Sequence, residues 1–203
     1  MTVSADTSTP RVVLVTGALG SAADAASIGR ALATGFARRG WDVALQRSHG
    51  APRAAADALV AEVAALGRRA AVLDADPALE ADAAALVAAC GEALADATPD
   101  AARDDETLRA CAIHVLDQAL FHPAPAQLSH ALMQAALNRA TSALALALAP
   151  KVRVAALVRG HAPHADDIAA AACYLASAPG VTGATLTVDG GEHLVPPAAG
   201  PNE

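Results

Sequence analysis

Short β-branched runs alternate with helical patterns along most of the chain, and this alternation is the feature that most constrains its fold. The expected strands are Arg11–Thr16, Trp41–Gln46, Ala70–Asp74, Cys111–Leu116, Val152–Val158 and Ala184–Val188. The expected helices are Ser27–Arg39, Ala51–Leu66, Ala78–Ala95, Gln127–Ala149 and Ala165–Ala176. Strands that alternate with helices through short connections are typical of a parallel sheet with helices on both faces. We therefore expect an α/β fold with a doubly wound parallel sheet.

The length of 203 residues fits a single domain. The polar composition at both ends predicts flexible tails at residues 1–10 and 196–203, which leaves residues 11–195 for the domain.

One strand of a regular doubly wound sheet is missing from the pattern. Residues 96–109 are polar and acidic and carry no strand signature, so we expect the sheet to lack its central fourth strand. A gap there would leave buried backbone groups unpaired at a cost of about 1–3 kcal/mol each. We therefore expect Val12–Thr16 to pair directly, in parallel, with Ala112–Leu116.

Composition excludes several classes of protein. Hydrophobic residues make up 54% and charged residues 17%, which is enough for a core, although 59 residues are alanine. The net charge of −7 without a basic run argues against nucleic-acid binding. No uncharged apolar stretch reaches membrane-spanning length, and no residue cluster predicts a metal site. Three widely spaced cysteines fit the reducing cytoplasm.

The first strand leads into a loop with the features of a dinucleotide site. Gly17 follows the strand, and Ser27, Ile28 and Gly29 are expected to open the next helix. Glycines let a backbone approach a pyrophosphate closely, and a helix N-terminus offers unpaired N–H groups to it. Gly17 and Gly29 are 12 positions apart, and residues 20–26 look like an insertion that would bulge out.

From Val12 to Leu194 the sequence resembles the short-chain dehydrogenase/reductase (SDR) family, which has a Rossmann-like fold. The segments that carry the resemblance are VLVTG, IGRALATGFARRGWDVAL, VLDAD, QAALNRATSALALALAP, KVRV and DDIAAAACYLASAPGVTGATLTVDGG. An aspartate, Asp117, follows the strand Cys111–Leu116, and within the family this is most similar to the pteridine reductases.

The resemblance places a changed catalytic triad in this chain. The family uses an acid or hydroxyl group, then Tyr-x-x-x-Lys on the next helix, and these positions fall on Asp117, His130 and Gln134. Histidine can donate a proton near neutral pH, but glutamine has no charge with which to tune a neighbouring group. The only tyrosine is Tyr174 and the only lysine is Lys151, so no other alignment restores the pair.

The same resemblance implies the cofactor NADP(H), if the chain binds one. Arg47 and Ser48 follow the second strand, and an arginine there suits a ribose 2′-phosphate, although a solvated surface arginine is an equal alternative. Asp76 matches the family's adenine-contacting aspartate, or else caps the following helix. Gly17, Ser27, Ile28 and Gly29 complete the cofactor-binding set.

Further family features are changed in the second half of the chain. The family's Asn-Asn-Ala-Gly strand is absent, and Ala155 and Arg159 replace the Asn and Pro that precede the glycine at position 160. The segment that covers the substrate in the family is reduced to residues 161–166.

Three functional hypotheses stay open. The leading one is a pteridine reductase-like SDR relative in which NADPH-dependent hydride transfer is impaired or lost, a pseudoenzyme. The second is a working NADPH-dependent reductase of a pterin-like or carbonyl substrate that uses Asp117 and His130. The third is a non-catalytic interaction subunit, because the long helix and the last strand build the oligomer in the family, and the resemblance places both here, at Gln127–Ala149 and Ala184–Val188. That helix predicts a homo-oligomer, or a hetero-oligomer with an SDR paralogue.

Overall fold

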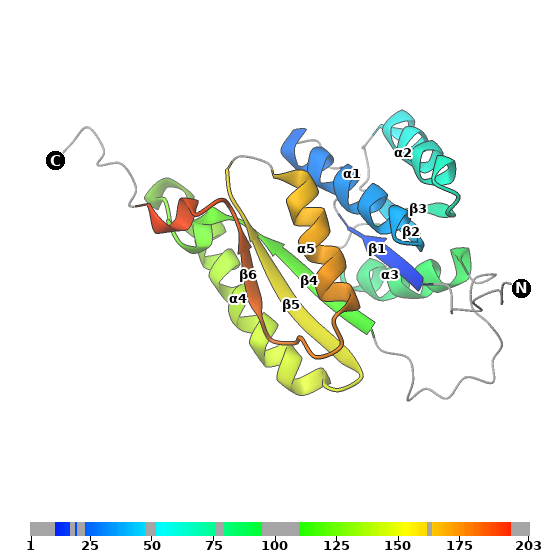
Figure 1. The fold of residues 1–203 in the computed structure, drawn as a ribbon. Helices are drawn as coiled ribbons and strands as arrows, with labels where there is room; N and C mark the ends of the chain where they lie inside the picture. Colours follow the sequence, from blue (N-terminus) through cyan, green and yellow to red (C-terminus); the bar gives the residue numbers. More distant parts are fainter. Residues whose placement is uncertain are drawn as a thin grey trace, which may run out of the picture. The chain divides into compact units, whose positions relative to one another are not determined.

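The computed structural model describes residues 11–16, 19, 23–47, 52–75, 79–94, 110–161 and 164–195. The chain divides into two compact units, residues 1–103 and 104–203, and each contains a three-stranded parallel sheet (Figure 1). The expected α/β class with parallel strands and helices on both faces of the sheets is confirmed.

The first unit alternates strands and helices in the order predicted. Its elements are β1 (Arg11–Val15), α1 (Ala23–Arg38), β2 (Trp41–Arg47), α2 (Arg53–Ala65), β3 (Ala70–Asp74) and α3 (Glu80–Ala93), and the strand order is β1-β2-β3. Helix α1 is followed by Gly40 at φ +83°, a left-handed conformation in which glycine has no Cβ penalty.

Alternation along the strands divides the core of this unit between two faces of the sheet. Val43 and Leu45 of β2 are fully buried in a cluster with Ala33 of α1 and Leu59 of α2. Ala44 lies in a second cluster with Cys90 and Leu94 from α3 and its end. Successive side chains of a strand point to opposite faces. Helices α1 and α2 therefore cover one face and α3 covers the other.

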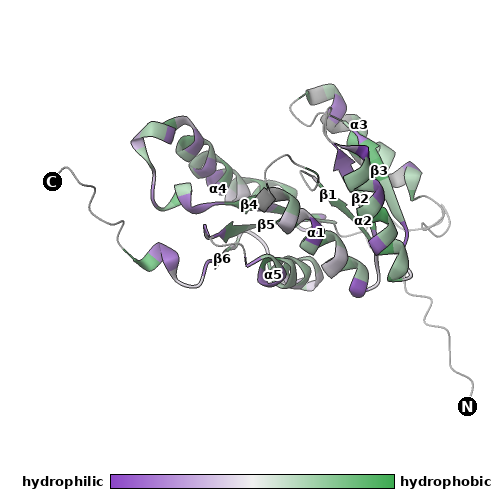
Figure 2. Ribbon diagram, turned by 90° about the horizontal axis from the view of Figure 1, so that it is seen from above, coloured by the Kyte–Doolittle hydropathy of each residue, from purple (hydrophilic) through white to green (hydrophobic). Residues whose placement is uncertain are grey.

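The second unit has the same plan. Its main elements are β4 (Ala110–Leu116), α4 (Leu128–Leu148), β5 (Val152–Arg159), α5 (Ala165–Ser177) and β6 (Thr185–Val188), with short 3₁₀ turns η2 (Gln118–Leu120), η3 (Pro125–Gln127) and η4 (Glu192–Leu194). The strand order is β4-β5-β6. In Figure 2, β4 and β5 are largely in the green of hydrophobic residues, whereas α4 mixes green and purple.

Side-chain contacts show which helix covers which face of the second sheet. His114 of β4 contacts Thr141 of α4, with 2.9 Å between Nδ1 and Oγ1. On the other face, the Arg153 guanidinium of β5 donates to the Leu175 carbonyl at 2.7 Å and to the Ala176 carbonyl at 2.8 Å, at the end of α5. Helices α4 and α5 thus lie on opposite sides of the sheet, as Figure 1 shows.

One expectation is corrected by these elements. Helix α1 begins at Ala23, so residues 23–26 form its first turn and do not bulge out. Within its own unit, β1 bonds along its length to β2, and β4 bonds to β5. The pairing of Val12–Thr16 with Ala112–Leu116 would join the two units, and it stays a prediction.

The described residues contain no strand between α3 and β4, and residues 95–109 lie outside the described part. None of the helices in the described ranges combines the length and apolarity needed to cross a membrane.

A buried carboxylate holds the start of β2 to the turn after α2. Asp42 is 2% exposed and accepts the Arg69 backbone N–H at 3.1 Å and the Arg69 guanidinium at 3.0 Å, while Arg68 contacts it at 2.8 Å. Burial alone would raise the pKa of Asp42, but these hydrogen bonds and positive charges outweigh it and lower that pKa.

We predict that Asp42→Asn lowers the free energy of unfolding by about 1–3 kcal/mol, because the amide leaves donors of Arg68 and Arg69 without their acceptor. Urea denaturation at neutral pH measures the change. Asp57→Asn is the matched control, because Asp57 is exposed and lies 3.9 Å from Arg53. Equal stabilities of the two variants would contradict the role of Asp42.

Candidate functional site

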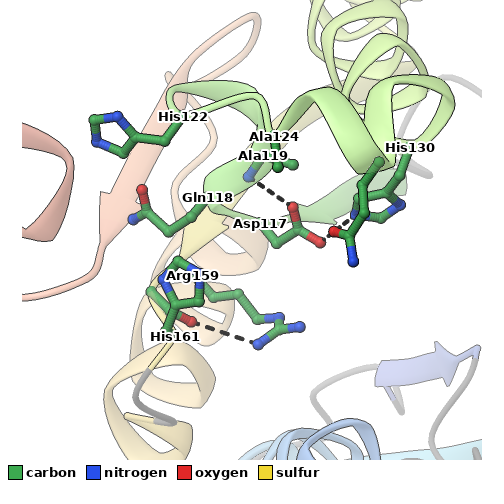
Figure 3. Close-up of a pocket in the computed structure, with 10 residues that line it drawn as sticks. Asp117, Gln118, Ala119, His122, Ala124, His130, Arg159 and His161 are labelled. Atoms are coloured by element: carbon green, nitrogen blue, oxygen red, sulfur yellow. Dashed lines mark hydrogen bonds and ion pairs between the residues drawn. The ribbon is translucent and has the colours of Figure 1, made fainter. Parts of the chain in front are cut away.

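A cavity of about 230 Å³ opens at the carboxyl ends of β4 and β5. It is lined by Asp117, Gln118, Ala119, His122, Ala124, Gln127, His130, Arg159, Gly160 and His161, all from the second unit (Figure 3). Parallel strands end together at this edge, and ligands of open α/β sheets bind outside it. The walls come from η2, η3, the start of α4 and the end of β5.

The three residues that the resemblance assigns to the triad positions lie together in the structure. The Asp117 carboxylate contacts Nε2 of His130 at 2.7 Å, and its other oxygen accepts the Ala119 N–H at 3.0 Å (Figure 3). The Gln134 side-chain oxygen accepts the Asp117 backbone N–H at 3.2 Å. Gln134 is only 6% exposed. Its carbonyl therefore supports the end of β4, while Asp117 fixes the imidazole.

The carboxylate–imidazole pair of Asp117 and His130 can exchange a proton with a ligand. Asp117 and His130 are 24% and 39% exposed, so solvent reaches both groups. With Nε2 held by the carboxylate, the other ring nitrogen, Nδ1, is the position left for exchanging a proton with a ligand. A carboxylate that orients an imidazole in this way is the arrangement used in acid–base catalysis.

A second carboxylate, Asp189, lies buried directly after β6. One oxygen accepts Nε2–H of Gln118 at 2.6 Å, the His193 N–H at 2.9 Å and Nδ1 of His193 at 2.8 Å. The other oxygen accepts the Gly191 N–H at 2.9 Å. Burial alone would raise the pKa of Asp189, but the hydrogen bonds from His193, Gly191 and Gln118 lower it far below its usual range. Asp189 is therefore ionised and can only accept hydrogen bonds.

The end of β5 supplies two further groups of the cavity wall. His161 donates its backbone N–H to Glu192 at 2.8 Å, and its imidazole Nδ1 also contacts that carboxylate. Hydrogen bonds from His161 lower the pKa of Glu192. The neighbouring Gly160 must be small: a Cβ there would lie 2.5 Å from the Glu192 carboxylate and 3.3 Å from Cα of Asp189.

The expected cofactor residues are only partly described. Gly17, Ser48 and Asp76 lie outside the described residues. Ser27, Ile28 and Gly29 lie in the second turn of α1, because the helix begins at Ala23, and Ile28 is a buried core residue.

Arg47 has a different environment from the one expected. Its guanidinium forms a two-pronged pair with Asp74 of β3, with two contacts of 2.7 Å. This hydrogen-bonded pair raises the pKa of Arg47. Arg47 is therefore not a solvated arginine, because a carboxylate holds it at the end of β2. Whether it also serves a ribose 2′-phosphate, together with Gly17, Ser48 and Asp76, stays a prediction.

Sequence reasoning missed three residues of the cavity. Gln118 directly follows Asp117, and its position just after a strand is the feature of the sequence that indicates a place at the site. Arg159 was noted only as a departure from the family, and His122 carried no local signal. His161 belongs to the segment 161–166 that was expected to be reduced, and the structure gives it Glu192 as a partner.

Comparisons with known proteins place this geometry in context. A family model described as SDR-like, short chain dehydrogenase-like protein, matches residues 77–188. Among solved structures, a short-chain dehydrogenase/reductase from Burkholderia xenovorans is similar with a TM-score of 0.76 and 22% identity, over 93% of this chain and 100% of the other. Acetoin dehydrogenase YohF from Salmonella typhimurium is similar with a TM-score of 0.75 and 20% identity, over 91% of this chain and 98% of the other.

A third similar structure is FolM alternative dihydrofolate reductase 1 from Brucella canis, complexed with NADP. Its TM-score is 0.73 at 22% identity, over 92% of this chain and 95% of the other. At these identities the solved structures establish the fold, which is Rossmann-like. No curated protein matches the sequence.

We predict that Asp189→Asn lowers the free energy of unfolding by at least about 2 kcal/mol. The asparagine NH₂ group would face the N–H donors of Gln118 or His193 in a buried network, where no acceptor is available to it. The folded-state pKa of Asp189 lies below its unfolded value, so its contribution is complete above pH ~4 and is lost as the pH falls further. Urea denaturation at pH 7 and pH 3 should show a smaller pH effect in the variant. Asp167→Asn, an exposed change on α5, is the control.

Proposed function

Because the chain belongs to the SDR-like family of short-chain dehydrogenase-like proteins, we propose that it is a pteridine reductase-like relative in which NADPH-dependent hydride transfer is impaired. The observation that carries the proposal is the environment of Gln134. The resemblance assigns this residue to the family's lysine position, yet it is 6% exposed, and its oxygen accepts a hydrogen bond from the Asp117 backbone. It therefore offers no charge to a neighbouring proton donor or to a ribose.

Two further observations support impairment. Asp74 neutralises Arg47, the residue expected to attract the phosphorylated ribose. Tyr174 is 60% exposed on α5, and Lys151 lies in the turn before β5, so neither replaces the missing pair at α4. A nicotinamide cofactor, when bound, supplies the hydride in this family. The pterin-like substrate rests on the resemblance and is supported by the structural similarity to FolM.

One contact favours the alternative of a working reductase. The 2.7 Å contact between Asp117 and His130 is the geometry of an imidazole ready to move a proton. In that function Asp117 orients His130, and Nδ1 of His130 gives the proton to the reduced carbonyl or imine.

The third hypothesis, association with another subunit, is supported by α4. Its exposed apolar side chains are Leu128, Leu132, Met133, Leu137, Leu144, Leu146 and Leu148. Leu132 is 61% and Leu146 86% exposed, and several exposed apolar side chains on one helix are a typical mark of a partner surface. We propose that a second copy of this chain, or an SDR paralogue, packs there.

We predict that the wild-type protein oxidises NADPH with dihydropterin or quinonoid substrates very slowly or not at all. Loss of a proton donor and its supporting cation removes general acid help worth roughly 10²–10⁴ in rate. The double variant His130→Tyr with Gln134→Lys should raise the rate, and NADPH absorbance measures it.

A wild-type enzyme that turns over at ordinary rates and loses activity in His130→Ala would contradict the impaired interpretation and favour the histidine-based reductase. NADPH fluorescence provides the binding control. If neither the wild type nor the double variant binds NADPH, the cofactor site itself has been lost and association becomes the leading function.

We predict that the protein self-associates at micromolar concentration, or with a paralogue, and that Leu132→Glu with Leu144→Glu yields a monomer. The two charges would be buried without partners in an α4 interface. Sedimentation equilibrium measures the mass. Tyr174→Glu, an exposed change on α5, should leave it unchanged. A monomeric wild type, alone and with a paralogue, rules out the interface.

A further inference from the structure

Five arginines lie at the edge of the first sheet where its strands begin, and we call this set the arginine row. Its members are Arg11, Arg38, Arg39, Arg68 and Arg69. Arg11 opens β1 in register with Trp41 of β2. The N–H of Val43, also in β2, donates to the Arg69 carbonyl at 3.0 Å, just before β3 begins. Neighbouring strands are about 4.8 Å apart, so the backbone positions of Arg11 and Arg69 are roughly 10 Å from each other.

The carboxylates near the arginine row do not balance its charge. Arg68 and Arg69 share one carboxylate, that of Asp42, at 2.8 and 3.0 Å. Glu92 is exposed in the last turn of α3 and forms no ion pair within 4 Å among the described residues. The other three arginines have no carboxylate within that distance in the described part of the chain. The row therefore has a surplus of positive charge, although the net charge of the whole chain is −7.

Backbone carbonyls hold three of these guanidiniums in place. Arg11 donates from Nη2 to the Arg39 carbonyl at 2.9 Å, and Arg39 donates from Nη1 to the Gly35 carbonyl at 3.0 Å. Arg69 donates from Nη2 to the Leu94 carbonyl at 3.2 Å. Carbonyls at helix ends attract cations without cancelling their charge, and a guanidinium has further N–H donors. An anion that binds here therefore immobilises these side chains at a smaller entropic cost.

Trp41 lies next to Arg11 and marks the position of the row. The Arg11 guanidinium lies over the indole ring, 5.0 Å from its centroid, and the Phe36 ring packs against the indole edge-on at 5.2 Å. Trp41 is the only tryptophan of the chain. An anion that binds Arg11 therefore changes the surroundings of the only indole in the protein, and fluorescence reports it.

The span and the charge of the row favour a short acidic peptide as its ligand. Residues three apart in an extended peptide are about 10 Å from each other, which matches the distance between the backbones of Arg11 and Arg69. A carboxylate binds a guanidinium through two parallel hydrogen bonds, which adds geometric specificity to the charge. A nucleic acid is long and uniformly negative, so it would also meet the acidic remainder of a chain with a net charge of −7.

We propose that the arginine row is a docking surface for a short acidic segment of a partner protein, whose carboxylates bind the exposed guanidiniums. This goes beyond the proposed function. Arg47 and the other expected cofactor residues of the strand ends belong to the opposite edge of the same sheet. Binding at the arginine row therefore requires neither a nucleotide nor hydride transfer.

The test uses fluorescein-labelled hexaglutamate as the probe and labelled hexaglutamine as its uncharged match, with anisotropy as the measure of affinity. We expect the wild-type protein to bind hexaglutamate with saturation, about tenfold or more tightly than hexaglutamine at about 0.05 M salt. Raising the salt to about 0.5 M should remove most of this difference, because exposed charges are screened. Unlabelled hexaglutamate should change the Trp41 fluorescence.

Matched variants locate the binding. Arg11→Gln with Arg38→Gln removes two charges from the row and should weaken hexaglutamate binding about fivefold. Arg53→Gln with Arg139→Gln removes the same two charges from exposed positions of α2 and α4 and should bind like the wild type. If the first double variant fails to fold, Arg38→Gln alone should weaken binding about twofold, since Arg38 is exposed.

Three outcomes overturn the proposal: equal affinity for the two peptides, no saturable binding of hexaglutamate, or the same loss of affinity in the row variant and its control. Tighter binding of an oligothymidylate than of hexaglutamate would assign the row to nucleic acid and would overturn it too. NADPH turnover enters none of these measurements. A protein that oxidises NADPH but ignores hexaglutamate refutes this inference alone, and one that binds hexaglutamate without using NADPH supports it alone.

Discussion

The buried carboxylate of Asp189 holds the candidate site together. It follows β6 and accepts hydrogen bonds from η2 through Gln118 and from η4 through His193. An ionised group at 7% exposure is stable only where donors surround it, and here four donors do. Those bonds fix the amide of Gln118 and tie η2 and η4 to the end of β6.

The polar network depends on the parallel sheet beneath it. Strands β4, β5 and β6 run in the same direction, so Asp117, Arg159 and Asp189 emerge from the same edge although they are far apart in sequence. Gly160 lets the turn after β6 approach the end of β5 closely. The backbone arrangement thus concentrates charge at one edge, and side-chain pairing then determines which charges remain available to a ligand.

Asp117 connects two elements of the site. Its carboxylate contacts Nε2 of His130, and its backbone N–H donates to the Gln134 side chain, so both residues of α4 are tied to the end of β4. The resemblance to the SDR family assigns these three residues to the triad positions, and the contacts are consistent with that expectation. The buried amide of Gln134 supports the strand end.

Much of the fold was determined by the sequence itself. Hydrophobic periodicity and flanking glycines predicted β3 at its observed bounds and most other elements within about two residues. This worked because the pattern of apolar residues within each segment depends on which of its side chains are buried. The resemblance singled out Asp117, His130 and Gln134 as a group, and the structure shows contacts from Asp117 to each of the other two. The start of α1 was misplaced, because its first turn is rich in alanine and lacks a distinctive pattern.

Only the tertiary structure decided which partners the charged and polar side chains have. Asp74 neutralises Arg47 because β2 and β3 lie in register, and no pattern within either strand reveals this. Asp189 orients Gln118 across 71 residues of sequence, and Arg159 remains without a carboxylate among the described residues. Pairing between distant side chains depends on how elements pack, whereas secondary structure depends on neighbours in the chain. The sequence therefore determined the elements and their order, and the packing decided which polar and charged side chains are paired.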